Sequence, residues 1–141
     1  GLDGLKRVYR NIPHNYPLPK RELLFDYKIF IPRNVGSGEF GDFTPTTVIA
    51  SPKDLCTETF IQVGPFKSLE EAENADNYIR TKFFRALISI RKQDQGASKA
   101  VYHFIPLQDF SKLWTDEELY AKYGLSEDEI AFIESMIRPM E

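Results

Sequence analysis

The sequence predicts an α+β fold, with a small mixed or antiparallel sheet, one long helix, and two short helices at the C-terminus. Three observations predict it. Short segments rich in β-branched and aromatic residues fill the first half, a run with helical periodicity covers residues 69–91, and two helix-capping sequences follow near the end. Strands that precede helices are not typical of a doubly wound βαβ series. The length of 141 residues fits one domain, which we place at residues 27–141.

The first segment, residues 1–26, is predicted to be a connector. Pro13, Pro17 and Pro19 fix the backbone φ angle and restrict the residue that precedes each of them, so an extended or turning path is expected there. The chain begins with Gly1 and has no initiator methionine. We therefore expect a fragment of a larger protein.

Three strands are predicted in the first half. Residues 27–31 alternate large side chains before Pro32, residues 46–50 are β-branched, and residues 57–63 run up to a Gly-Pro stop. A glycine-rich stretch at 34–42 separates the first two strands. Because no helix signal follows it, we interpret it as a flexible loop and not as a phosphate-binding loop.

A long helix is predicted over residues 69–91. Ser68 and Glu71 have the spacing of a capping box at its start. Its apolar residues recur at spacings of four, four and three, the period of one helix face. These residues are Ile79, Phe83, Leu87 and Ile90.

After this helix we expect a loop at 93–99 and a strand at 101–105 that ends before Pro106. Two more capping boxes, Thr115–Glu118 and Ser126–Glu129, then predict the two short helices. Gly124 stands where the first of them should end.

Charge is unevenly distributed along the chain. The formal net charge is −3, which taken alone argues against binding to nucleic acid. Residues 77–100, however, carry six Lys or Arg against one Asp, a net +5, and residues 101–141 carry a net −6. The net charge therefore conceals a basic segment followed by an acidic one.

The basic segment yields a candidate DNA-binding face. On a continuous helix, spacings of four, three, four and three place an aromatic ring, three cations and a hydroxyl on one side, where they could follow a phosphate backbone. These residues are Tyr78, Lys82, Arg85, Ser89 and Lys92. Thr81 lies beside them, and Gln95 and Lys99 add donors in the following loop. The simpler alternative is a solvated helix surface whose charges complement the helix dipole.

Catalytic chemistry finds little support in the residues. His14, Cys56 and His103 are too far apart in the sequence for zinc-ligand spacing, and we predict no metal site or catalytic residue in the chain. A metal-dependent nuclease could use Glu22, Asp26 and Lys28, although such short patterns are common by chance. The single cysteine suggests a reducing compartment, the cytoplasm. No apolar run reaches the length of a membrane span, so no membrane partner is expected.

Six blocks of sequence, in their order and spacing, carry a resemblance to a known family. The blocks are Cys56–Phe60, Gly64–Phe66, Tyr78–Arg85, Phe104–Phe110, Trp114–Leu125 and Glu129–Pro139. Together they resemble the C-terminal, target-recognition region of bacterial restriction–modification proteins that carry an adenine-specific DNA methyltransferase domain. The resemblance covers residues 27–139.

The resemblance implies a part of a larger bacterial enzyme that reads DNA sequence or supports the part that does. The methylase motifs would lie upstream, and some members also carry a nuclease or helicase segment. Partners would be double-stranded DNA and the catalytic domain of the parent chain. The chain itself would need no cofactor, whereas the parent would use S-adenosylmethionine, with Mg²⁺ as a second candidate. Within the matching helix block, the resemblance points to Thr81, Lys82 and Arg85 as DNA contacts.

Two other functions stay open on the sequence. One is a protein-interaction module that docks domains of the parent through the acidic helices at 115–138. The other is the small metal-dependent nuclease described above.

Overall fold

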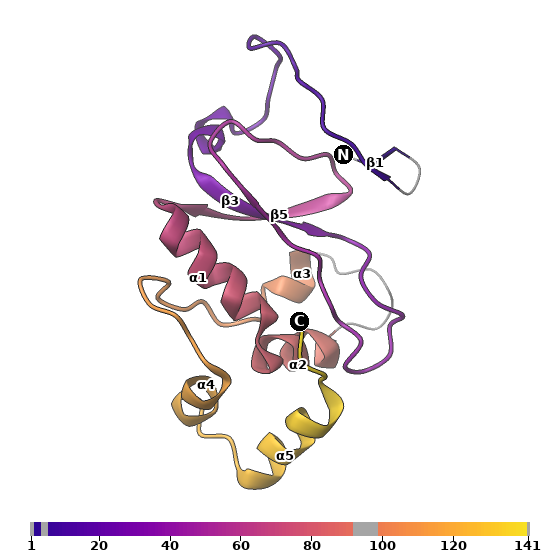
Figure 1. Cartoon of the computed structure of the whole chain (residues 1–141), viewed down its shortest axis with the longest axis vertical. Coiled ribbons are helices and arrows are strands. Elements are labelled where there is room, and N and C mark those ends of the chain that lie inside the picture. Colours follow the sequence, from indigo (N-terminus) through magenta and orange to yellow (C-terminus); the bar gives the residue numbers. More distant parts are fainter. Residues whose placement is uncertain (1, 4–5, 92–98, 141) are drawn as a thin grey trace.

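The computed structural model describes residues 2–3, 6–91 and 99–140, and it confirms the α+β class (Figure 1). Three antiparallel strands form the sheet in the order β4-β3-β5. They are β3 (Tyr27–Pro32), β4 (Val48–Ala50) and β5 (Phe60–Phe66). Near the N-terminus, β1 (Leu2–Asp3) pairs with β2 (Lys6–Arg7).

The helical elements lie mainly in the second half. A 3₁₀ helix, η1 (Arg21–Phe25), precedes β3. The α-helices are α1 (Leu69–Arg80), α2 (Lys82–Arg91), α3 (Lys99–Tyr102), α4 (Asp116–Lys122) and α5 (Glu127–Met136). In Figure 1, α1 lies along one side of the sheet and η1 lies on the other, with α4 and α5 at the far end of the molecule.

The two faces of the sheet carry two separate clusters of buried side chains. Ile29 and Ile31 of β3 are fully buried in the main core, which includes residues of α1, α2 and α4. The alternate residue, Phe30, packs with Ala50 and Phe60 in a smaller cluster. Because successive side chains of a strand point to opposite faces, β3 supports both clusters. The smaller cluster lies on the side of the sheet away from α1.

The single long helix predicted over 69–91 is wrong, because the helix breaks at Thr81. This residue adopts an extended conformation, with a ψ of 150°, and its hydroxyl donates to the Tyr78 carbonyl at 2.6 Å. The Thr81 hydroxyl also accepts from the backbone N–H of Phe84, so that it caps α2. The Asp116 carboxylate accepts from the backbone N–H groups of Lys82 and Phe83. The Asp116 carboxylate, 33 residues from Phe83 in the sequence, thus completes the N-terminal cap of α2.

Two further predictions of local structure need correction. The strand expected at 101–105 is wrong, since residues up to Tyr102 belong to the short helix α3, where the Tyr102 ring contacts Phe43 and Phe84. The strand expected to stop at Gly64 continues to Phe66, which lies opposite Tyr27 of β3. The two short C-terminal helices are confirmed as α4 and α5.

The helix caps follow the predicted pattern, with one complete capping box. Ser126 accepts from the Glu129 backbone N–H, and the Glu129 carboxylate accepts from the Ser126 N–H. Ser68 and Thr115 also accept from the third residue of their helices. The predicted capping boxes at Ser68 and Thr115 are half formed, because the Glu71 carboxylate accepts from the Lys67 N–H and the Glu118 carboxylate pairs with Lys112.

Candidate nucleic-acid interface

Four of the six predicted DNA-binding residues that the structure describes lie in the interior. Tyr78 is 2% exposed and Arg85 is fully buried, and Thr81 and Ser89 are buried as well. Tyr78, Arg85 and Ser89 belong to the predicted DNA-binding helix face, so the prediction that this face is open to a phosphate backbone is wrong. Thr81, expected beside that face, is buried with them. The physical cause is twofold: the helix breaks at Thr81, and the glycine-rich loop and the C-terminal tail cover α2.

Arg85 is the centre of this covered region. Its Nε donates to the Phe43 carbonyl at 2.7 Å, and Nη1 donates to the Arg138 carbonyl. Ser89, one turn later, donates to the Arg85 carbonyl at 2.8 Å and accepts from the Gly41 N–H at 3.1 Å. The two side chains thereby fasten the glycine-rich loop and the C-terminal tail to α2. The loop, predicted to be flexible, is anchored at Gly41 and Phe43.

The other predicted residues are placed differently. Lys82 is partly exposed, and its amine forms an ion pair with Glu134 of α5. Lys99, at the start of α3, is exposed. Lys92 and Gln95 lie outside the described residues.

The Lys82–Glu134 pair gives an expected pH dependence of stability. The hydrogen bond from Lys82, assisted by one from Tyr120, holds the pKa of Glu134 below its ordinary value. The stabilisation is therefore present above the ordinary carboxyl pKa and is lost as the pH falls through the lowered pKa. Glu134→Gln should flatten the acid limb of the free energy of unfolding, measured by urea denaturation at several pH values. The exposed Glu127→Gln is the matched control, and an equal effect of both variants would contradict the assignment.

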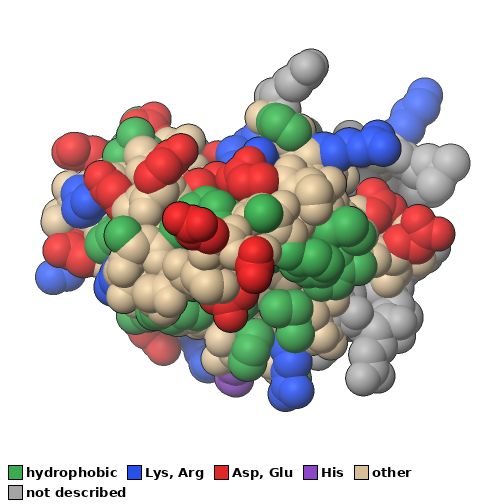
Figure 2. Space-filling view, turned by 90° about the horizontal axis from the view of Figure 1, so that it is seen from below, with side chains coloured by type: hydrophobic (Ala, Val, Ile, Leu, Met, Phe, Trp, Pro, Cys, Tyr) green, Lys and Arg blue, Asp and Glu red, His purple; other side chains and the backbone are tan. Residues whose placement is uncertain are grey.

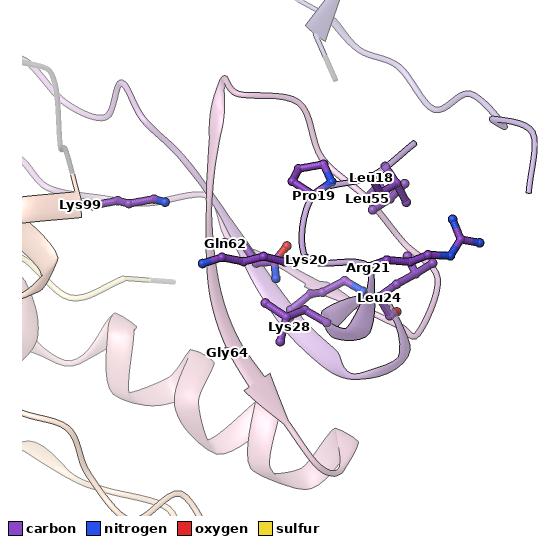
Figure 3. Close-up of a pocket in the computed structure, with 11 residues that line it drawn as sticks. Leu18, Pro19, Lys20, Arg21, Leu24, Lys28, Leu55, Gln62, Gly64 and Lys99 are labelled. Atoms are coloured by element: carbon purple, nitrogen blue, oxygen red, sulfur yellow. Dashed lines mark hydrogen bonds between the residues drawn. The ribbon is translucent and has the colours of Figure 1, made fainter. Parts of the chain in front are cut away.

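Four cationic residues line one cavity of about 310 Å³ (Figure 3), which we call the basic pocket. The helical spacing of the sequence did not bring these residues together. It lies over η1, the beginning of β3 and the edge strand β5. Its cations are Lys20, Arg21, Lys28 and Lys99, and no Asp or Glu is among its described lining residues. In Figure 3, the side chains of Lys20 and Lys99 extend toward each other from opposite sides.

Lys28 is the buried cation of the basic pocket. Its amine donates to the carbonyls of Leu24, at 3.1 Å, and Asp26, at 3.3 Å. Burial lowers its pKa, and the nearby Asp54 and Asp26 carboxylates partly oppose that effect. An ammonium group has three donors, so one donor remains beyond these two bonds.

Arg21 and Gln62 complete the polar lining. The Arg21 guanidinium donates to the carbonyls of His14, at 2.7 Å, and Tyr16, and so holds the proline-rich connector. These acceptors are neutral, so the positive charge of Arg21 is not neutralised by them. Gln62 lies opposite Phe30 in the β3–β5 ladder, between the pairs that bring Ile61 and Val63 against β3. The Arg33 N–H donates to the Thr59 carbonyl, which marks a hydrogen-bonded pair of the antiparallel ladder. Because hydrogen-bonded and non-hydrogen-bonded pairs alternate, the Phe30–Gln62 pair is not hydrogen-bonded, and the backbone of Gln62 points to the free edge of β5.

The opposite end of the molecule is acidic. The first turns of α4 and α5 carry three carboxylates each. Figure 2, which views the molecule from below, shows acidic side chains interspersed with hydrophobic ones on that face. Lysines also pair with carboxylates on α4 and α5, and Asp26 and Asp54 lie near Lys28, but the net charge of −3 describes neither the lining of the basic pocket nor the acidic first turns of α4 and α5.

The residues considered for catalysis do not assemble a site. Cys56 packs against the smaller cluster of the sheet, and burial raises the pKa of its thiol. Within residues 2–3, 6–91 and 99–140, no three His, Cys, Asp or Glu side chains are grouped so that they could hold a metal ion. The Lys28 amine of the proposed nuclease motif is bonded to backbone carbonyls, one of them that of Asp26.

No helix in the described part of the chain combines the length and the apolar character that a membrane span requires. Comparisons with protein-family models, with curated proteins and with solved structures find no match to this chain.

Proposed function

We propose that the chain is a DNA-binding, target-recognition domain of a restriction–modification enzyme and that it contacts duplex DNA at the basic pocket. One observation carries the proposal: four cations, three from residues 20–28 and one from α3, surround a cavity that no carboxylate lines among the described residues. Phosphate oxygens are the complementary ligand, because lysine and arginine that meet a DNA backbone release its condensed counterions. The resemblance of residues 27–139 to the target-recognition region supports the same function.

The residues of the basic pocket have distinct roles in this proposal. Lys20 and Lys99 bind phosphates at the mouth, where both are exposed. Lys28 offers its remaining donor from the floor. Gln62 carries an amide that can pair with the edge of adenine, so it is the candidate for a base contact. Of the predicted DNA-binding residues that the structure describes, Lys99 lines this pocket.

The test removes the two exposed lysines together. Lys20→Gln with Lys99→Gln should weaken binding to a duplex, and the slope of log K against log salt should become shallower by about 2, one unit for each lost phosphate contact. Fluorescence anisotropy of a labelled duplex over a series of salt concentrations measures both quantities.

The matched control is Lys67→Gln with Lys112→Gln, which removes the same charge from exposed positions away from the pocket. The control should leave the slope unchanged. Equal slopes for wild type and the pocket variant would remove the basic pocket from the DNA-binding surface.

A docking module remains the second candidate, because the acidic face of α4 and α5 also exposes Phe132 and Met136. Its partner would be the catalytic domain of the parent chain. Exposed apolar side chains among like charges are typical of an interface that meets a basic partner. Binding to that domain, lost when Glu127, Asp128 and Glu129 are changed to Gln while DNA binding persists, would support this role.

A further inference from the structure

Two exposed lysines face each other across the basic pocket. Lys20 directly precedes η1, and Lys99 begins α3. Their side chains extend toward each other from opposite sides of the cavity (Figure 3). Among the described residues, neither amine is paired with a carboxylate. Two like charges that face each other repel, and an anion held between them would be attracted by both.

The free edge of β5 adds neutral donors to the same cavity. The backbone of Gln62 points to this edge, and both Gln62 and Gly64 line the cavity. The side chain of Gln62 is exposed and ends in an amide. The Gln62 backbone N–H and side-chain amide can therefore donate to an anion that the two lysines hold.

Lys28 contributes a positive charge at the floor of the cavity. Its amine donates to the carbonyls of Leu24 and Asp26, which are neutral acceptors. The Asp26 and Asp54 carboxylates lie near it but do not line the cavity, and Asp54 accepts from the Ser51 N–H at 2.9 Å. Lys28 therefore raises the electrostatic potential of the cavity without having to touch the ligand.

A terminal phosphate matches these groups better than a phosphate within a strand. An internal phosphodiester carries about one negative charge, whereas a phosphomonoester carries up to about two and has three free acceptor oxygens. We propose that the basic pocket binds a phosphomonoester whose oxygens are shared between the Lys20 and Lys99 amines. This binding mode rests on the function proposed above, and the phosphate belongs either to a DNA strand end or to a free nucleotide.

The apolar part of the lining suits the carbon body of such a ligand. Leu18, Pro19 and Leu55 lie together on one side of the cavity in Figure 3. Aliphatic side chains can pack against a sugar or a base. The volume of about 310 Å³ is at the small end of the range for ligand pockets, which fits one nucleotide unit and not a stretch of duplex.

The test compares two short duplexes that differ only in carrying a 5′-phosphate or a 5′-hydroxyl. Fluorescence anisotropy with a 3′ label should show that wild type binds the phosphorylated duplex about 10-fold more tightly, as expected for hydrogen bonds to a charged group. Adenosine 5′-monophosphate should displace that duplex, whereas adenosine should not. Displacement by the nucleotide without any preference between the duplex ends would identify a free nucleotide as the source of the phosphate.

Two variants should abolish the preference for the phosphorylated end. Lys20→Gln with Lys99→Gln removes both amines, and Gln62→Glu places a carboxylate beside them at an exposed position. The matched control, Lys67→Gln with Lys112→Gln, should keep the full preference, because neither residue lines the pocket.

The outcomes separate this inference from the proposed function. Equal affinity of wild type for the two duplexes, together with no displacement by the nucleotide, would overturn the phosphomonoester site. The proposed function would still stand if duplex binding weakened in the Lys20 and Lys99 variant. Binding of the nucleotide by a protein that binds neither duplex would support the phosphomonoester site and remove the proposed function.

Discussion

Arg85→Ala is expected to lower the free energy of unfolding by about 3–5 kcal/mol, because it removes a large buried side chain and two hydrogen bonds from a charged donor. Arg85 is fully buried and donates to the carbonyls of Phe43 and Arg138. Alanine would leave both carbonyls without this donor and would open a cavity at the centre of α2. The glycine-rich loop and the C-terminal tail would lose their common attachment.

The matched control is Arg80→Ala, one helix earlier. The Arg80 side chain is 36% exposed, and it bonds to Asp76 and Thr47, each at 2.9 Å. Because solvent screens such a pair, its loss should cost about 1 kcal/mol or less. Urea denaturation of the three proteins followed by circular dichroism gives the comparison.

A different result would indicate that the Arg85 side chain is exposed in solution. If Arg85→Ala unfolds at the same urea concentration as wild type and binds DNA more weakly, the side chain contacts DNA in solution. If the variant loses stability as expected, a loss of DNA binding in it says nothing about direct contact. Lys20 and Lys99 are for that reason the better positions for the DNA test.

The features that could be predicted from the sequence are those set by neighbours along the chain. Capping residues such as Ser126 act within three positions, and they placed the beginnings of α1, α4 and α5 correctly. Alternating and β-branched residues likewise located β3 and β4. The class of the fold follows from these local signals.

The break at Thr81 could not be predicted in this way. No glycine or proline marks it, and half of the cap comes from Asp116, more than thirty residues later in the chain. The candidate DNA-binding face depended on a continuous helix across this point. Helical spacing places Arg85 on the candidate DNA-binding face, whereas in the interior it donates to two backbone carbonyls from other segments, and its Nη2 has no partner among the described residues.

The basic pocket was missed for a related reason. Its cations come from positions 20–28 and from Lys99, and residues 1–66 as a whole are nearly neutral, with eight Lys or Arg against seven Asp or Glu. No window of sequence therefore stands out. Only the folded sheet brings η1, β5 and α3 around one cavity.

Gly41→Ala is the second change with a large expected effect. Gly41 has a φ of +87°, a conformation that costs a residue with a Cβ about 1–2 kcal/mol. A Cβ at this position would also overlap the carbonyl oxygen of Met136, which belongs to the backbone at the end of α5. Backbone cannot move aside as a flexible side chain would. The loop would have to leave α2, with loss of the bond between the Gly41 N–H and Ser89.

Gly124→Ala separates the two contributions. Gly124 also has a positive φ, of +63°, but a Cβ there would meet nothing within 4 Å. Its replacement should therefore cost about 1 kcal/mol through backbone strain alone, whereas Gly41→Ala should cost about 2–4 kcal/mol. Thermal and urea unfolding of both variants measure the difference. Equal destabilisation would mean that the glycine-rich loop does not pack on the end of α5, and that Arg85 and Ser89 do not hold it there.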